Sequence, residues 1–290
     1  MFLQQVINGI TVGCIYGLVS LGYTLIFGVI GLINFAHGEV YMFGAFIAFS
    51  VLSILGGPFF LAVIAVIIGA ALLGYLMDGI VYRPIRTAPR VSQLITALAI
   101  SMVLRNLAML IWGTRTMAFP SVFSIRVLEF AGIRVTQLQL AIPAVTLLLM
   151  IGLHKLIYST RLGKAVRATS LDSEIASAMG IEPNHVIAAV FALGASLGGV
   201  AGLLVALFYG SISFDMGVTV GLRAFVACII GGIGSIHGAM LGGLIIGLAE
   251  VMATGYISPG YKNAIAFLIL TMVLVVKPSG IFGFLVEKSE

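Results

Sequence analysis

The chain has 290 residues, of which 61% are hydrophobic and only 9% are charged, and its formal net charge is +5. Soluble domains contain roughly 45–50% apolar and about 25% charged residues, so this composition excludes a water-soluble domain and predicts an all-α polytopic membrane protein, with residues 1–290 as one transmembrane domain. The net positive charge does not indicate a nucleic-acid partner, because no Lys or Arg precedes Arg83 and no basic binding face is present.

Apolar segments long enough to span a bilayer occur about eight times, since a spanning helix needs roughly 20 apolar residues. The candidate spans are residues 9–31, 40–56, 59–77, 92–112, 138–157, 185–208, 222–254 and 263–277. The stretch 222–254 is too long for one ordinary span and has glycines at its middle. It therefore predicts a broken helix or a re-entrant pair, which leaves the number of spans open by one or two.

Basic residues gather in two of the connecting segments, 78–90 and 154–184. Cytoplasmic loops carry the excess of Lys and Arg, so these segments are predicted to be cytoplasmic, together with Lys277 and Lys288. The N-terminus and residues 113–137 are then external. Five cations lie outside in this orientation, which keeps the opposite orientation open: Arg115, Arg126, Arg134, Arg223 and Lys262.

The external segment 113–137 predicts a small β-hairpin. Residues 122–130 and 133–135 show partial polar alternation, and Ala131 and Gly132 lie between them as a turn. A hairpin outside the membrane could receive a partner protein, or it could be a connector that covers the helix ends.

Glycine recurs at every fourth position in two of the spans, at Gly9, Gly13 and Gly17 and at Gly194, Gly198 and Gly202. Small residues at this spacing form a flat stripe on a helix, along which another backbone can approach closely. These stripes predict helix packing and no chemistry.

Two short segments of the chain resemble each other. Residues 30–38 read IGLINFAHG and residues 230–238 read IGGIGSIHG, with five identities at an offset of 200. Paired, glycine-interrupted apolar segments indicate binding sites in transporters built from repeats, because an unwound stretch frees backbone groups that lipid cannot satisfy. A coincidence between Gly- and Ile-rich sequences remains the alternative. The predicted translocation-path residues are Asn34, His37, Gly38, Glu39, Gly231, Gly234, Ser235 and His237.

Glu39, Arg105 and Glu250 are ionisable residues in or near spans. Such groups are costly at membrane depth, so we expect them to face the bundle interior or a cavity and to pair with one another. The alternatives are a cytoplasmic turn for Glu39 and a snorkelling or structural position for Arg105.

The longest hydrophilic stretch lies within residues 158–184 and has helical periodicity. Gly180 and Pro183 are expected to end this helix. A short amphipathic helix is predicted, which could dock on a partner or lie on the membrane surface. Its apolar face would carry Ala168, Leu171, Ile175, Ala178 and Met179.

Motifs of enzymes do not occur in the chain. There is no HExxH and no GxxxxGK[ST] phosphate-binding loop, and the four histidines do not have metal-ligand spacing. We therefore predict no catalytic residue, no metal site and no bound cofactor.

Three segments carry a resemblance to a known family: GLINFAHGEVYMFGAF (31–46), GGIGSIHGAMLGGLIIGLAE (231–250) and the loop 158–184. With them, essentially the entire chain resembles the LivH-type permease of branched-chain amino acid ABC importers. In the loop, the residues that match the ATPase-coupling segment of such permeases are Gly163, Arg167, Ala168, Asp172, Ala176, Gly180 and Ile181.

The resemblance implies a multi-pass permease subunit of a bacterial inner membrane that moves Leu, Ile or Val inward. The implied partners are a LivM-type second permease, two cytoplasmic ATPase subunits that use ATP and Mg²⁺, and an external solute-binding protein that the hairpin helps to receive. Similar permeases handle urea, short amides or other amino acids, and a pair of identical permease chains remains open. The alternative of another class is an ion-coupled secondary transporter or channel that uses Glu39, Arg105 or Glu250.

Overall fold

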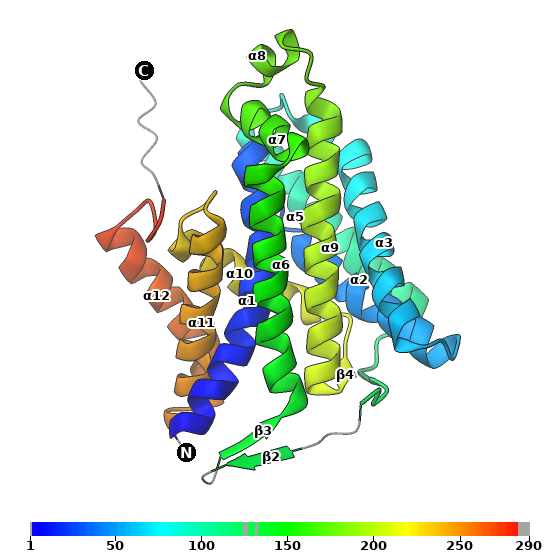
Figure 1. The fold of residues 1–290 in the computed structure, drawn as a ribbon, viewed down its shortest axis with the longest axis vertical. Helices are drawn as coiled ribbons and strands as arrows, with labels where there is room; N and C mark the ends of the chain where they lie inside the picture. The colour runs from blue at the N-terminus through cyan, green and yellow to red at the C-terminus, as the bar shows by residue number, and fades with distance from the viewer. Residues whose placement is uncertain (1, 124–126, 131–132, 284–290) are drawn as a thin grey trace.

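The computed structural model describes residues 2–123, 127–130 and 133–283. It is a bundle of long helices joined by short connections, with two small two-stranded sheets (Figure 1). Within the described residues, eight helices are long and apolar enough to cross a membrane, which confirms the predicted polytopic all-α class. Arg126 and Lys288, used above for the orientation, lie outside the described residues.

The elements follow one another with few irregular stretches. The helices of the first half are α1 (Phe2–Ile30), α2 (His37–Phe49) with a π-helical end (Ser50–Ile54), α3 (Phe59–Met77) with a π-helical end (Asp78–Tyr82), α4 (Arg83–Ile85) and α5 (Arg90–Trp112). Those of the second half are α6 (Gln137–Ser159), α7 (Arg161–Leu171), α8 (Ser173–Ala178), α9 (Pro183–Tyr209), α10 (Met216–Gly231), α11 (Ile236–Tyr256), a 3-10 turn (Pro259–Tyr261) and α12 (Lys262–Val276). The strands are β1 (Met117–Ala118), β2 (Val127–Phe130), β3 (Ile133–Thr136) and β4 (Ser211–Ile212).

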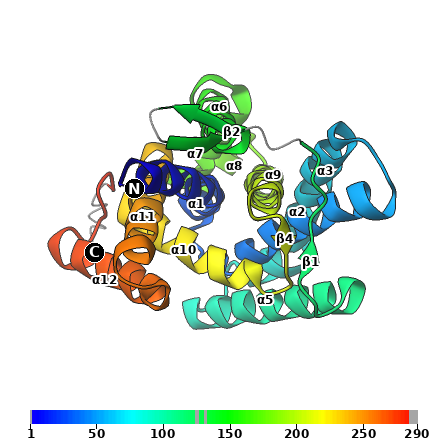
Figure 2. The same cartoon turned by 90° about the horizontal axis from the view of Figure 1, so that it is seen from below.

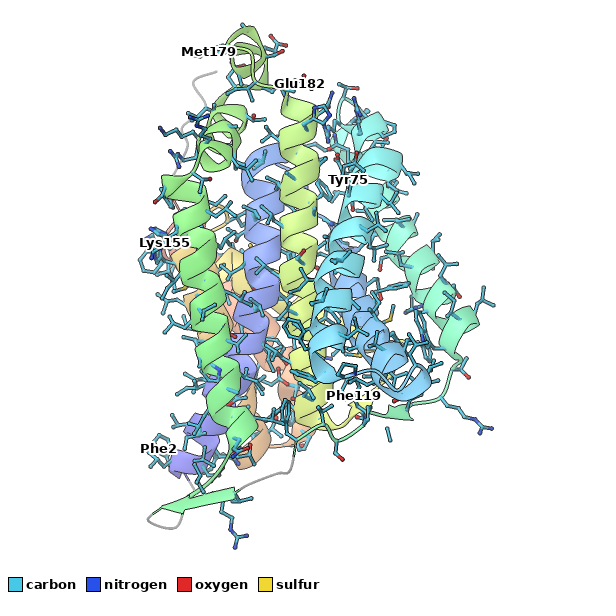
Figure 3. All side chains as sticks on the ribbon, turned by 45° about the vertical axis from the view of Figure 1, so that its right-hand side comes forward. Phe2, Tyr75, Phe119, Lys155, Met179 and Glu182 are labelled. Carbon is cyan, nitrogen blue, oxygen red and sulfur yellow. The ribbon has the colours of Figure 1, made fainter. Side chains whose placement is uncertain are left out.

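The bundle has two distinct ends. The end that carries α4, α7 and α8 holds most of the arginines and lysines, and we call it the basic end; the N-terminus and the β2–β3 hairpin lie at the opposite end, the hairpin end. Figure 3 shows Phe2 at the hairpin end and Met179 and Glu182 at the basic end. The positive-inside rule assigns the basic end to the cytoplasm.

The predicted hairpin and the predicted broken segment are both confirmed. Strands β2 and β3 pair antiparallel, with Val127 opposite Thr136, while the turn at 131–132 lies outside the described residues. The stretch 222–254 divides into α10 and α11 at Gly232 and Gly234, whose φ angles of 98° and 93° favour glycine.

Close backbone contacts at glycines hold the longest helices together. The most extensive packing is between α1 and α11, where a Cβ on Gly247 would overlap the backbone of Gly13 and a Cβ on Gly243 would overlap that of Gly17. Lipid supplies no hydrophobic force between helices, so such close approach provides the van der Waals contact that associates them. The glycine stripe predicted at the start of the chain therefore has this packing role.

The fold contains an inverted repeat that sequence comparison did not reveal. Helices α1, α2, α3 and α5 correspond in order and packing to α9, α10, α11 and α12, which run in the opposite direction: α9 packs most on α3, as α1 does on α11. Each unit has a six-residue connection after its first helix, 31–36 and 210–215. Each connection opens on a glycine of positive φ, Gly31 at 66° and Gly210 at 64°.

The matched sequences at 30–38 and 230–238 do not occupy equivalent places in this repeat. The first crosses the connection between α1 and α2, whereas the second forms the turn between α10 and α11. The sequence match therefore reflects the shared use of glycine in two kinds of turn, and the structural counterpart of 31–36 is the connection 210–215.

The α1–α11 contact makes a prediction for stability. Substituting Gly247→Val inserts a side chain where the backbone of Gly13 already lies, and overpacking of this kind costs about 1–3 kcal/mol or more. Thermal unfolding of the purified protein should occur at a lower temperature for Gly247→Val than for Gly152→Val, because Gly152 has open space where its Cβ would be. Equal unfolding temperatures for the two variants would contradict the packing role.

Candidate functional site

The beginnings of α2 and α10 meet inside the bundle. A Cβ on Gly217 would lie only 2.7 Å from the carbonyl oxygen of Gly38, and one on Gly221 would lie 2.8 Å from the Cα of Gly38. Each of these two helices therefore starts from a connection that turns back into the bundle. Helix α2 starts from the basic end and α10 from the hairpin end (Figure 1). We call this place the crossing point.

His37 lies at the crossing point as the first residue of α2. Its side chain is completely buried and fills the space beside Gly22 of α1 and Gly198 of α9. A Cβ on Gly22 would overlap the imidazole, and one on Gly198 would lie 3.3 Å from its Nε2. The ring of Tyr23 meets it edge-on at a centroid distance of 4.8 Å. Only glycines leave room for an imidazole between three helices at this depth.

Several buried polar atoms at the crossing point have no hydrogen-bond partner among the described residues: both ring nitrogens of His37, Oε2 of Glu39 and the hydroxyl of Tyr41. The backbone of Val19 lies near the His37 ring without a well-aligned hydrogen bond. An unsatisfied buried polar group costs about 1–3 kcal/mol, so four such atoms within five residues of α2 require an explanation. If the helices part, these atoms can bind water or a polar solute.

Glu39 and Glu250 belong to two separate polar clusters. Glu39 is buried in the first turn of α2, and not in a cytoplasmic turn; its Oε1 accepts a 3.0 Å hydrogen bond from Ser101 of α5, and it interacts electrostatically with Arg105. Glu250 pairs with Arg223 at 3.2 Å and with Lys262 at 3.6 Å. No ion pair joins Glu39, Arg105 and Glu250, all three of which are among the described residues; Arg105 is an electrostatic neighbour of Glu39, and Glu250 pairs with other residues.

The second predicted group of path residues lies elsewhere, at the turn between α10 and α11. Ser235 caps α11 by accepting a 3.1 Å hydrogen bond from the Gly238 amide, and Gly231 packs against the backbone of Gly238. Gly234 approaches Gly28 near the end of α1. His237 is exposed, with its ring centroid 5.0 Å from that of His154 on α6. The structure does not bring this group together with His37 and Glu39, and a role for either group in translocation stays a prediction.

Asn34 leads to a polar network that sequence reasoning missed. Tyr82, at the end of α3, donates a 2.7 Å hydrogen bond to Oδ1 of Asn34 in the connection 31–36. Nearby, Arg86 forms an ion pair with the buried Asp78 and donates a 2.7 Å hydrogen bond to Oδ1 of Asn184, at the start of α9. One signal was available: Asp78 is the only acid among the three arginines of residues 78–90.

The predicted cytoplasmic helix is present as two helices, α7 and α8, because Asp172 breaks it. Asp172 has extended backbone angles, and its carboxylate accepts hydrogen bonds of 2.8 and 2.9 Å from the amides of Glu174 and Ile175. Asp is a preferred N-cap, so it ends α7 and starts α8, which a periodicity argument does not detect. Gly180, with φ of 83°, ends α8 as predicted.

The other residues predicted for coupling hold this two-helix segment in shape. A Cβ on Gly163 would overlap the end of α6, and the Arg167 guanidinium bonds the carbonyl of Ile157 in the same place. Ala176 is buried and its carbonyl accepts a 3.1 Å hydrogen bond from the Ile181 amide, while the carbonyl of Ala168 accepts one from Asp172.

The tip of this segment exposes large apolar side chains: Leu171 is 87% exposed and Met179 is 79% exposed, and Ile175 is exposed between them. Beneath the tip lies a cavity of about 750 Å³, whose lining includes Arg86, Asn184 and Ile30 at the end of α1. The segment therefore exposes apolar side chains beside a cavity that is lined by both polar and apolar residues.

Comparison with known proteins gives one consistent result. A family model described as "Branched-chain amino acid transport system / permease component" matches residues 5–275. The chain is 42% identical to the high-affinity branched-chain amino acid transport system permease protein LivH of Salmonella typhimurium, over 97% of this chain and 96% of that protein. It is 40% identical to the corresponding protein BraD of Pseudomonas aeruginosa over the same shares. It is 28% identical to the autoinducer 2 import system permease protein LsrD of Escherichia coli O157:H7, over 86% of this chain and 73% of that protein. No solved structure matches the chain.

The Asp78–Arg86 pair makes a prediction. In Arg86→Met the Asp78 carboxylate stays buried without its partner, and breaking a buried pair in this way costs about 3–5 kcal/mol. The free energy of unfolding should fall far less in the exposed control Arg83→Met, and the double variant Asp78→Asn with Arg86→Met should lose less than the sum of the single variants. Additive losses would mean that the two residues do not act as a pair.

Proposed function

Because this chain belongs to the family of branched-chain amino acid transport permease components, we propose that it is the LivH-type membrane subunit of an ATP-driven importer that moves Leu, Ile and Val inward. It is a multi-pass inner-membrane protein with the helices that such a subunit needs. The observation that carries the proposal is the identity of 42% over nearly the full length of both chains. Permeases of this family work with ATPase and solute-binding partners.

The apolar tip of α7 and α8 is the element that we propose meets an ATPase subunit. Leu171, Ile175 and Met179 expose apolar surface at the basic end, on helices that are not among the candidate membrane spans. An apolar helix face of this kind fits a groove in a partner protein. The break at Asp172 and the contacts of Gly163 and Arg167 keep the tip rigid, so that force applied to it reaches α6 and α9.

We further propose that the polar network transmits a movement of α7 and α8 into the bundle. Asn184 is the second residue of α9, and its bond to Arg86 joins the start of α9 to the end of α4. The bond from Tyr82 then joins the end of α3 to Asn34, in the connection before α2. Movement of α7 and α8 over the cavity would change these bonds, and thereby the position of His37 and Glu39. A movement of α7 and α8 can change the position of His37 and Glu39 only if the contacts that join them differ between the two conformations.

The proposed complex has four kinds of chain. A LivM-type second permease completes the membrane part, two ATPase subunits hydrolyse ATP with Mg²⁺, and a solute-binding protein docks at the hairpin end. The hairpin suits this contact because it is fixed to the bundle: Gln4 of α1 donates a 2.9 Å hydrogen bond to the carbonyl of Arg134 and accepts a 3.1 Å bond from its amide. No cofactor is proposed for this chain itself.

The proposal is tested by uptake into proteoliposomes that hold the chain with the second permease, ATPase and binding protein encoded beside it. We expect accumulation of radiolabelled leucine, isoleucine and valine that requires ATP and the binding protein. Urea, acetamide and an unrelated amino acid serve as competing solutes. Uptake that persists without ATP when an ion gradient is present would refute the ATP-driven mechanism, and ATP-driven uptake of a competitor alone would refute the substrate.

The apolar tip gives a separate prediction. Met179→Asp places a charge in the proposed groove and should reduce leucine uptake at least about tenfold, the factor that corresponds to a loss of 1.4 kcal/mol. Met179→Leu, which stays apolar at the same site, should transport normally. Both variants should insert in the membrane equally, as measured by their amounts in purified membranes, and normal uptake by Met179→Asp would exclude this contact.

A further inference from the structure

The chain folds back on itself after α12. Residues 277–283, which we call the C-terminal clasp, form a compact turn that continues this helix. The amide of Lys277 donates a 2.7 Å hydrogen bond to the carbonyl of Val273, and the amide of Gly280 donates a 2.8 Å bond to the carbonyl of Lys277. The ammonium group of Lys277 donates a further 2.7 Å hydrogen bond to the carbonyl of Ile281. The clasp therefore has a defined shape at the end of α12.

The C-terminal clasp completes the end of α10. The last four carbonyl groups of a helix have no partner within the helix. In α10 the amide of Gly232 donates to the first two of them, at 3.1 Å each. The clasp supplies the other two donors, because the Ile281 amide bonds the carbonyl of Ile230 at 2.8 Å and the Phe282 amide bonds that of Gly231 at 2.9 Å. All four carbonyl groups at this end of α10 are therefore paired within the chain.

Glycines allow the clasp to lie directly against the backbone at the end of α10. A Cβ on Gly280 would lie 2.5 Å from the carbonyl oxygen of Ile229, and one on Gly232 would overlap the backbone of Gly283. Gly280 and Gly232 also have positive φ angles, of 77° and 98°, which favour glycine. The clasp is therefore packed tightly on α10 as well as hydrogen-bonded to it.

The inverted repeat has an equivalent contact at the other end of the bundle. Helices α5 and α12 both lie at the outside of the bundle, α5 against α2 and α12 against α10 (Figure 2). Trp112, the last residue of α5, donates a 2.9 Å hydrogen bond to Oγ of Ser50, which follows the last α-helical residue of α2. The Trp112 ring also stacks on Phe46 at a centroid distance of 4.8 Å. In each unit, therefore, the end of the fourth helix is bonded to the end of the second.

The beginnings of α2 and α10 are joined differently from their ends. At the crossing point Gly217 and Gly221 pack against Gly38, and no hydrogen bond joins α2 to α10 in the part of the chain that the structure describes. Helix α10 has 16 residues, so it is about 24 Å long, and a displacement of its end also moves its first turn. The clasp at the basic end therefore helps to determine where α10 meets Gly38 and Glu39.

We propose that the C-terminal clasp is a positioning element for transport, which ties α10 to α12 so that the two helices move together when the importer changes conformation. The inference rests on the proposed function and adds to it a segment separate from α7 and α8. Without the clasp, the end of α10 is free to shift, and its first turn no longer follows the movement of the bundle. ATP hydrolysis then continues while less solute is moved for each ATP.

Two shortened chains test the clasp in the assembled importer. One chain ends after Lys277 and lacks the amides that bond α10, and the matched control ends after Gly283 and keeps them. We expect the shorter chain to transport at least about tenfold less leucine per ATP hydrolysed than the control, because two hydrogen bonds that fix α10 are lost. The ratio is informative because a loss of folded protein lowers transport and hydrolysis together and leaves the ratio unchanged.

A backbone ester tests one of these hydrogen bonds with every side chain in place. The α-hydroxy acid analogue of Ile281 has an ester oxygen in place of the N–H, so the donor to Ile230 is lost. The same replacement at Ser279 is the control, since the Ser279 amide donates no hydrogen bond among the described residues. We expect leucine transported per ATP to fall about threefold or more in the Ile281 ester and to stay unchanged in the Ser279 ester.

The unmodified importer is measured in parallel, so that failure of the proposed function is separated from failure of this inference. An unmodified importer that does not move leucine contradicts the proposed function. In an importer that moves leucine, the unmodified ratio in the Ile281 ester, or an equal fall in the Ser279 ester, would overturn the role of the clasp. The ester decides the matter even where the chain that ends after Lys277 fails to assemble.

Discussion

Close backbone contact at glycine is the interaction on which this structure depends. A bilayer supplies no hydrophobic force for helix association, so α1 and α11 are associated through facing glycines, and α3 and α9 through glycines that face small side chains such as Ala70 and Ala195. At the crossing point the same device lets two helices start side by side, with Gly38 against Gly217. Replacing glycine by larger residues there would separate the half-helices and open an unfilled space among polar groups.

The arrangement of polar groups follows from this packing. A tightly packed interior has little room for water, so charged and polar side chains must find partners within the bundle. Most do: Arg223 with Glu250, Arg86 with Asp78, and Tyr82 with Asn34. Among the described residues, the buried polar atoms without a hydrogen-bond partner are most concentrated at the start of α2, where they are both ring nitrogens of His37, Oε2 of Glu39 and the hydroxyl of Tyr41. Their location indicates the part of the bundle whose chemistry is incomplete in this conformation.

Sequence reasoning reached the features that local composition determines. Runs of apolar residues gave the spans, glycines near residue 232 gave the break between α10 and α11, and alternation gave the hairpin. It missed the re-entrant connection 210–215, because Gly210–Asp215 has the polar composition of an ordinary loop. It also missed the Tyr82–Asn34 and Arg86–Asn184 bonds, whose partners are 48 and 98 residues apart and are brought together only by the helix packing. The break at Asp172 escaped because a capping carboxylate can sit within a periodic pattern.

The inverted repeat also explains the presence of α6, which belongs to neither unit. The first unit crosses the membrane an even number of times and so returns the chain to the side on which it began. A second unit that continued from there would have the same orientation as the first. One additional crossing reverses it, and α6 is that crossing. Because α6 ends at the basic end, the segment that connects it to the second unit must lie at that end. Helices α7 and α8 are therefore placed where an energy-supplying subunit could reach them.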